Sequence, residues 1–165
     1  MITKHLLFYY MVHKRQDFNC FGCSIQNGEH KFPGGFLYSG RYFNIVQDPC
    51  IPIPGFLVVN AKRHIASIAQ FTPSETKEFT QIVYIARKAM LEALGLKTAY
   101  LVQEERSCHF HLWILPEYEW MKKFKPGISS ARKIMRYATE HLITKRDQGN
   151  LAKSIRKLKK YFKDI

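Results

Sequence analysis

The stretch that most constrains the fold lies at positions 108–116. His109, His111 and Trp113 alternate there with apolar residues. Successive side chains of a β-strand point to opposite faces of a sheet, so these three side chains are expected on one face. The residues between them are apolar enough to pack on a core. The sequence therefore predicts a strand at 109–115 that presents imidazole groups on one side of a packed sheet.

A long amphipathic helix is predicted between Thr72 and Gly95. Thr72 suits the N-cap position, Pro73 the first helical position, and Glu75 completes a capping box. Gly95 is a natural C-cap. Apolar residues recur between these ends at spacings of three and four: Phe79, Ile82, Val83, Ala86, Met90, Ala93 and Leu94.

Other elements are predicted from shorter signals. The apolar run Leu6–Val12 suits either a short helix or an added strand, and the glycines and proline that follow the first two cysteines indicate a loop. Gly149 and Asn150 are expected to separate two C-terminal helices. The predicted strands are 36–39, 42–47, 56–60 and 98–103, and the remaining predicted helices are 64–70, 129–144 and 151–162.

The positive charge of the chain is concentrated near its C-terminus. The whole chain carries +13, but residues 121–165 contain 14 Lys and Arg against three acidic residues, while residues 1–120 carry only +2. We expect one domain at 1–120 and a basic helical extension at 121–165. Residues 122–163 could bind nucleic acid or another polyanion, or could form a solvated face of packed helices. Within them, Leu151–Phe162 could contact an acidic membrane surface, because its narrow apolar stripe has basic flanks.

Cysteine usage indicates a reducing compartment. Cys20 and Cys23 form a C-x-x-C pair, while Cys50 and Cys108 are isolated. Leu6–Val12 is too short to cross a bilayer and is not followed by a small-residue cleavage site. We therefore expect a cytoplasmic protein without a transmembrane segment, in which the pair is a metal site or a redox pair rather than a structural disulfide.

Several motifs, taken in order, resemble those of the histidine triad (HIT) superfamily of nucleotide hydrolases and transferases. These motifs are the C-x-x-C pair, Pro54-Gly55 with the apolar strand that follows, Lys62-Arg63-His64-Ile65, and the histidine strand that ends at Pro116. The resemblance runs from about Asn19 to Pro116. It implies an α+β fold with an antiparallel sheet, here joined to one long helix and the basic C-terminal helices, and a homodimer.

The resemblance also implies a chemistry. In that superfamily the middle histidine attacks a nucleoside-linked phosphate to give a nucleotidyl-histidine, and His111 holds this position. Trp113 stands where the third histidine is expected, and Asp48 stands where an aspartate binds the ribose hydroxyls, although an ordinary turn aspartate is equally compatible with its context. Ser107 is the nearest side-chain donor for phosphate oxygens. The expected substrate is a dinucleoside polyphosphate or a nucleoside phosphoramidate.

The same region predicts a zinc site. Cys20 and Cys23 have the spacing that tetrahedral zinc favours, and His64 and His109 could complete a Cys2His2 set. In similar HIT proteins such a set holds a zinc, whose expected role here is structural. The alternative is two unbound thiols and two hydrogen-bonded histidines. No organic cofactor is expected.

Two hypotheses about function follow. The first is a nucleotide-binding hydrolase or transferase that acts through His111, favoured by His111 and Asp48. The second is a catalytically weak, zinc-stabilised module that holds a polyanion on its basic helices. Trp113 and Glu104 favour the second, because Glu104 aligns where the superfamily usually has an asparagine near the phosphates. A hybrid would process a nucleotide attached to the end of a nucleic acid.

Overall fold

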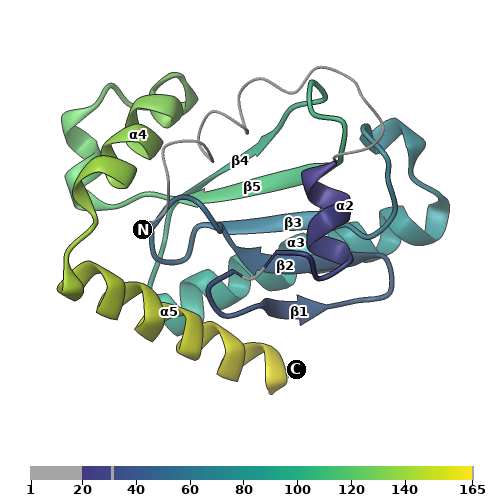
Figure 1. Cartoon of the computed structure of the whole chain (residues 1–165), viewed down its shortest axis with the longest axis horizontal. Helices are drawn as coiled ribbons and strands as arrows, with labels where there is room; N and C mark the ends of the chain where they lie inside the picture. Colours follow the sequence, from purple (N-terminus) through teal and green to yellow (C-terminus); the bar gives the residue numbers. More distant parts are fainter. Residues whose placement is uncertain (1–19, 31, 165) are drawn as a thin grey trace.

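Five antiparallel strands form the centre of the protein (Figure 1). The structure is a computed structural model that describes residues 20–30 and 32–164, so the predicted element at Leu6–Val12 lies outside the described residues. The strands lie in the order β1-β2-β3-β5-β4. Their bounds are Phe36–Ser39 for β1, Phe43–Gln47 for β2, Leu57–Ala61 for β3, Ala99–Gln103 for β4 and His111–Pro116 for β5.

The long helix α3, Pro73–Leu94, begins and ends as predicted. The Thr72 hydroxyl accepts from the Glu75 backbone N–H, and the Glu75 carboxylate accepts from the Thr72 backbone N–H, so both halves of the capping box form. Gly95 ends the helix with φ of 72°, a left-handed conformation that glycine adopts without strain. These local signals were enough to predict both ends of the helix.

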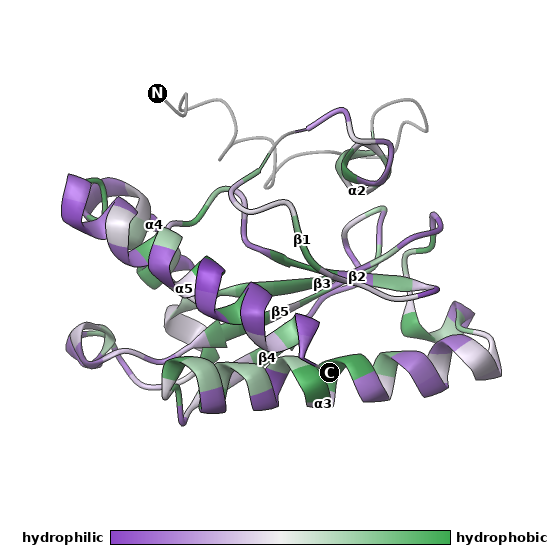
Figure 2. Cartoon of the chain, turned by 90° about the horizontal axis from the view of Figure 1, so that it is seen from below, coloured by the Kyte–Doolittle hydropathy of each residue, from purple (hydrophilic) through white to green (hydrophobic). Residues whose placement is uncertain are grey.

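The two faces of the sheet are covered differently, as Figure 2 shows. Helix α3 covers one face, and its apolar stripe packs against alternate strand residues such as Phe43, Leu57 and Ile114, which are fully buried. Burying each such side chain contributes about 1.5–3 kcal/mol. The opposite face carries α2, Phe21–Gln26, near one end and α4, Ala131–His141, near the other. Helix α2 was not predicted, since only a loop was expected after the cysteine pair.

The C-terminal helices differ from the prediction. Helix α5 spans Lys145–Lys163 and continues through Gly149, so the predicted break at Gly149-Asn150 is wrong. The break lies after His141 instead, because Thr144 and Asp147 form a complete capping box that starts α5 there. One glycine in a helix costs only about 1 kcal/mol relative to alanine, which the cap and the packing of the helix offset.

Both C-terminal helices pack on the rest of the chain. In α5, Ile155, Leu158 and Phe162 are buried in the core cluster that also contains the α3 stripe. In α4, Ile134 and Ala138 are buried in a second cluster on the opposite face of the sheet. The apolar stripe of α5 is therefore used inside the protein. No helix in the described part of the chain is long and apolar enough to cross a membrane.

Candidate functional site

A polar row crosses three strands on the sheet face that α2 covers. His111 in β5 pairs with Asn60 in β3, and Asn60 pairs with Asn44 in β2. Paired residues on antiparallel strands point to the same face, so these three side chains stand side by side. Asn44 and Asn60 are buried, and His111 is partly exposed. Strand pairing thus places one buried amide beside His111 and a second amide one strand farther away.

The four predicted zinc ligands meet at one end of this face. The Sγ and ring nitrogen atoms of Cys20, Cys23, His64 and His109 all lie within 4.8 Å of one another. The Cys20 Sγ is 3.3 Å from His109 Nδ1, and the Cys23 Sγ is 3.2 Å from His64 Nδ1. Tetrahedral zinc, with bonds of about 2.3 Å to sulfur and 2.0 Å to nitrogen, places such atoms about 3.5 Å apart. The donor set and its spacing fit zinc.

The tautomer of His109 also fits a metal ligand. Its Nε2 lies 2.8 Å from the carbonyl oxygen of Ala61, which can only accept, so Nε2 carries the proton. Nδ1, which faces the two sulfur atoms, then carries the lone pair. A carbonyl that holds the far nitrogen of a ligating histidine is the usual second contact at zinc sites.

Helix α2 is placed directly over the His109 ring. A Cβ at Gly22 would lie 2.3 Å from the ring, so only glycine permits this approach. Burial opposes ionisation of the Cys20 thiol, but the adjacent His109 ring and the hydrogen bond from the Cys23 backbone N–H outweigh it and lower the pKa of Cys20 to about 5. A thiolate at neutral pH is the form that binds metal.

His111 is oriented by the backbone that precedes it. Its Nδ1 lies 3.1 Å from the carbonyl oxygen of His109 and therefore donates to it, which puts the lone pair on Nε2. Burial lowers the pKa of His111, and the His109 charge lowers it further, while the hydrogen bond and the charge of Glu104 raise it. The net effect is a neutral imidazole near pH 7, which is the nucleophilic form.

Ser107 and Trp113 flank His111. The Ser107 hydroxyl donates to the His109 carbonyl oxygen at 2.8 Å and lies 3.5 Å from His111 Nδ1. The Trp113 ring centre is 5.3 Å from that of His111 and 6.2 Å from that of Phe56. Trp113 therefore forms a partly buried wall between His111 and the apolar cluster beneath α4.

Asp48 lies on the same face but farther away. It follows β2, two strands from β5, and is displaced by four residues along the strands from the His111 row, a separation of roughly 16 Å between Cα atoms. Its Oδ1 accepts from the backbone N–H groups of Cys50 and Ile51, and burial raises its pKa to about 6. A ligand that contacts both side chains would have to reach across β3, which lies between β2 and β5.

Asn44 and Asn60 were missed by the sequence analysis. The Asn44 side-chain amide donates to Gln26 Oε1 at 2.6 Å. Asn60 Nδ2 is buried and has no hydrogen-bond partner among the described residues. The available signal was an asparagine at the end of an apolar strand, where a buried amide needs a partner. Its position beside His111 could not be read without the strand register.

No protein-family model and no curated protein matches this chain. A zinc-bound histidine triad family protein from Mycobacterium smegmatis matches 90% of this chain and 96% of its own, with a TM-score of 0.62 and 15% identity. A hypothetical histidine triad nucleotide-binding protein from Sulfolobus tokodaii matches 87% of this chain and 94% of its own, with a TM-score of 0.60 and 22% identity. This chain has the histidine triad fold.

The predicted fold class is thereby confirmed. A HIT family protein from Bacillus subtilis shares the fold as well, with a TM-score of 0.57, 19% identity and coverage of 84% of this chain and 96% of its own. Within this histidine triad fold, His111, Ser107 and Trp113 lie together, and the two cysteines meet His64 and His109 beside them. Asp48 stands apart at the far end of the same face.

Proposed function

We propose that the protein is a nucleotide-binding hydrolase or transferase that acts on a nucleoside phosphate conjugate through His111. The observation that carries the proposal is the hydrogen bond from His111 Nδ1 to the His109 carbonyl, together with the lowered pKa of His111. Together they give a neutral imidazole whose Nε2 holds the lone pair. The substrate class, a dinucleoside polyphosphate or a phosphoramidate, comes from the resemblance to the histidine triad superfamily.

The reaction has two displacement steps. His111 Nε2 attacks the phosphorus, a P–N bond forms, and the bond from phosphorus to the leaving group breaks with its electron pair on that group. Water or another acceptor then attacks the same phosphorus and forms a P–O bond. The P–N bond breaks with its electron pair on His111 Nε2, and the proton of the acceptor is released to solvent. Transfer at phosphorus depends mainly on positioning and on donors to the phosphoryl oxygens.

Two side chains can supply such donors. Asn60 is paired with His111 and offers an Nδ2 with no partner among the described residues. The Ser107 hydroxyl lies 3.5 Å from the His111 ring, and can turn from the His109 carbonyl to a phosphate oxygen. Asn60 thus supplies an amide donor beside His111. Glu104 cannot take this role, because its carboxylate repels phosphate.

Trp113 bears on the choice between the two substrate types. An indole donates a hydrogen bond but cannot deliver a proton to a leaving group. A phosphate leaving group departs as a stable anion, whereas an amine must be protonated as it leaves. We therefore expect a dinucleoside polyphosphate to be turned over faster than a phosphoramidate.

Turnover of the two substrates tests this function. Diadenosine tetraphosphate and an adenosine phosphoramidate are incubated with wild-type protein, with His111→Ala and with His30→Ala as a matched control, because His30 is exposed and outside the site. His111→Ala should lose at least about a thousandfold in rate, and His30→Ala should retain it. Absence of turnover by the wild type would refute the enzyme proposal.

A structural zinc belongs to the same proposal. Cys20, Cys23, His64 and His109 would hold it, and bound zinc would tie α2 and the loop after β3 to the strand that carries His111. No disulfide joins the four cysteines, which suits the reducing cytoplasm that the sequence predicts.

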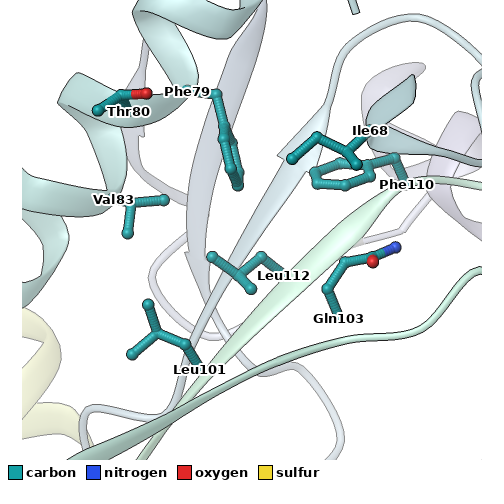
Figure 3. Close-up of a pocket in the computed structure, with 8 residues that line it drawn as sticks. All are labelled: Ile68, Phe79, Thr80, Val83, Leu101, Gln103, Phe110 and Leu112. Carbon is teal, nitrogen blue, oxygen red and sulfur yellow. The ribbon is translucent and has the colours of Figure 1, made fainter. Parts of the chain in front are cut away.

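A homodimer is proposed through the edge of β4. The other edge of the sheet, β1, is covered by α5, where Tyr38 packs on Phe162 with ring centres 5.9 Å apart. Among the described residues β4 pairs only with β5, Leu101 is 51% exposed at this edge, and an apolar hollow lies between β4 and α3 (Figure 3). A second copy related by a two-fold axis would pair its own β4 with this edge and bury the same residues. This hollow lies on the face opposite His111.

Binding of a polyanion to the C-terminal helices is a second candidate. Residues 121–165 contain 14 Lys and Arg. Of these, only Lys122 forms an ion pair within the described residues, with Glu119. Unpaired cations at this density attract phosphate-rich polymers, and their affinity should fall steeply with salt. Binding that is absent, or that does not change with salt, would remove this candidate.

A further inference from the structure

The end of α4 carries two stacked rings. Tyr137 and His141 are four residues apart, so they are neighbours on one face of the helix. Their ring centres are 4.0 Å apart and their planes differ by 8°. Among the ring pairs of the described residues, this one alone has the geometry of a parallel stack.

The His141 ring is held flat and is exposed. Its Nδ1 lies 3.0 Å from the Tyr137 carbonyl oxygen and therefore donates to it. Stacking and this hydrogen bond together fix the ring while its residue remains exposed to solvent. An ordered aromatic ring with an outer face in water is a surface on which another flat ring can stack without a large loss of side-chain entropy.

A lysine and two further aromatic rings pack against Tyr137. Lys123 Nζ lies 3.2 Å from the Tyr137 ring centre. Because His141 lies within 4.0 Å of the same centre, the two occupy opposite faces of Tyr137. Trp120 and Phe124 support Tyr137 with ring centres at 5.4 and 5.7 Å. Both faces of the Tyr137 ring are thus occupied, one by Lys123 and one by His141. Another flat ring can therefore join the stack only on the outer face of His141.

Three unpaired cations are close to this stack in the sequence. Lys133 lies four residues before Tyr137, so Lys133, Tyr137 and His141 follow one line along α4. Arg136 precedes Tyr137, and Lys145 lies four residues after His141. Both are exposed, as is the acidic Glu140, and none of the three cations forms an ion pair with a described residue. Flat rings interleaved with cations are the pattern of proteins that bind single-stranded nucleic acid, where bases stack and phosphates meet Lys and Arg.

We propose that His141, stacked on Tyr137, is a platform for one base of a single-stranded nucleic acid whose phosphates contact the cations of α4 and α5. This inference rests on the second candidate function and makes it more specific. Duplexes should bind more weakly, because their bases are already stacked on one another and cannot stack on His141. Only the contacts between their phosphates and the cations then contribute to binding.

Three substitutions at one exposed position separate stacking from charge. Affinity of the full chain is measured for a short RNA of mixed sequence, the DNA of the same sequence and the matching duplex, each over a range of salt. His141→Ala removes the platform and should weaken single-strand binding about tenfold. His141→Lys removes the ring but adds charge, and should also weaken it. His141→Trp keeps a flat ring and should retain it.

The outcomes are distinguishable. Tighter single-strand binding by His141→Lys, or equal binding of single strands and duplex by the wild type, would show that charge alone acts and would overturn the platform while leaving polyanion binding intact. No binding of any of the three nucleic acids would refute both. Because position 141 is exposed at a helix end, all three variants should melt near the wild-type temperature, which a thermal scan verifies.

Discussion

The backbone carbonyl of His109 accepts a hydrogen bond from the His111 ring, and the His109 ring faces the sulfur atoms of two cysteines. The His111 Nδ1 lies 3.1 Å from the His109 carbonyl oxygen, and the His109 Nδ1 lies 3.3 Å from the Cys20 Sγ. One residue therefore couples the proposed metal site to the proposed nucleophile. A change that displaces the His109 backbone should affect both, and a change at His111 should affect only the second.

The proposed zinc can be tested by metal content. Wild-type protein purified without chelator should contain about one zinc per chain, and Cys23→Ser should lose most of it. Its melting temperature should fall by at least about 5 °C, because bound metal stabilises only the folded state. Cys50→Ala is the matched control: Cys50 is buried outside the cluster, so this variant should lose stability but keep its zinc. Wild-type protein without zinc would contradict the site.

The pH dependence of turnover should reflect the protonation of the His111 imidazole. The nucleophile must be neutral, and burial lowers its pKa, so the rate should stay high as the pH falls and decline only below the ordinary histidine value of about 6.5. The charge of Glu104 raises this pKa. Glu104→Gln should therefore move the acid limb of the kcat/KM profile to lower pH. A limb that moves to higher pH, or does not move, would argue against this electrostatic contact.

Asp48→Asn should stabilise the protein. The pKa of Asp48 is about 6, above its unfolded value, so the ionised carboxylate costs stability at pH 7 and the cost disappears as the pH falls from 6 towards 4. Asparagine keeps an oxygen for the Cys50 and Ile51 N–H groups. The gain should be on the order of 2 kcal/mol at pH 7 by denaturant unfolding. If Asp48 binds the ribose, the same variant should raise KM, whereas a turn aspartate would leave KM unchanged.

Asn60→Ala should lower kcat/KM by about 10²-fold, the usual effect of removing a donor to a developing negative charge. Asn44→Ala provides the comparison, since Asn44 lies on the same row but one strand farther from His111. Steady-state kinetics with diadenosine tetraphosphate gives the ratio. Equal losses in the two variants would indicate a general effect on packing and not a donor beside the nucleophile.

The proposed dimer can be broken at the open edge. Leu101→Lys places a charge on β4 and should convert a dimer into a monomer in light scattering. Ile143→Lys is the matched control, because Ile143 is 63% exposed between α4 and α5, away from β4. A wild-type mass equal to one chain would dispose of the dimer without affecting the fold.

Sequence reasoning succeeded where the signal was local. The capping box at Thr72 and the glycine at position 95 fixed α3, and the strands were located to within two residues. It failed at Gly149, where propensity predicted a break but the cap at Thr144 and the burial of Ile155 kept the helix intact. It also missed α2, a single turn and a half whose helical form depends on packing against His109.

By itself the sequence determined the chemical groups and their local periodicity: two thiols three residues apart, imidazoles on alternate strand positions, and a basic segment at 121–165. Only the tertiary structure decided which groups meet. Strand register placed Asn60 beside His111, and chain folding brought Cys20 within 3.3 Å of a ring 89 residues away. Spacing along the chain reports the few residues within one element, whereas contacts between distant elements depend on register and topology, which no local pattern encodes.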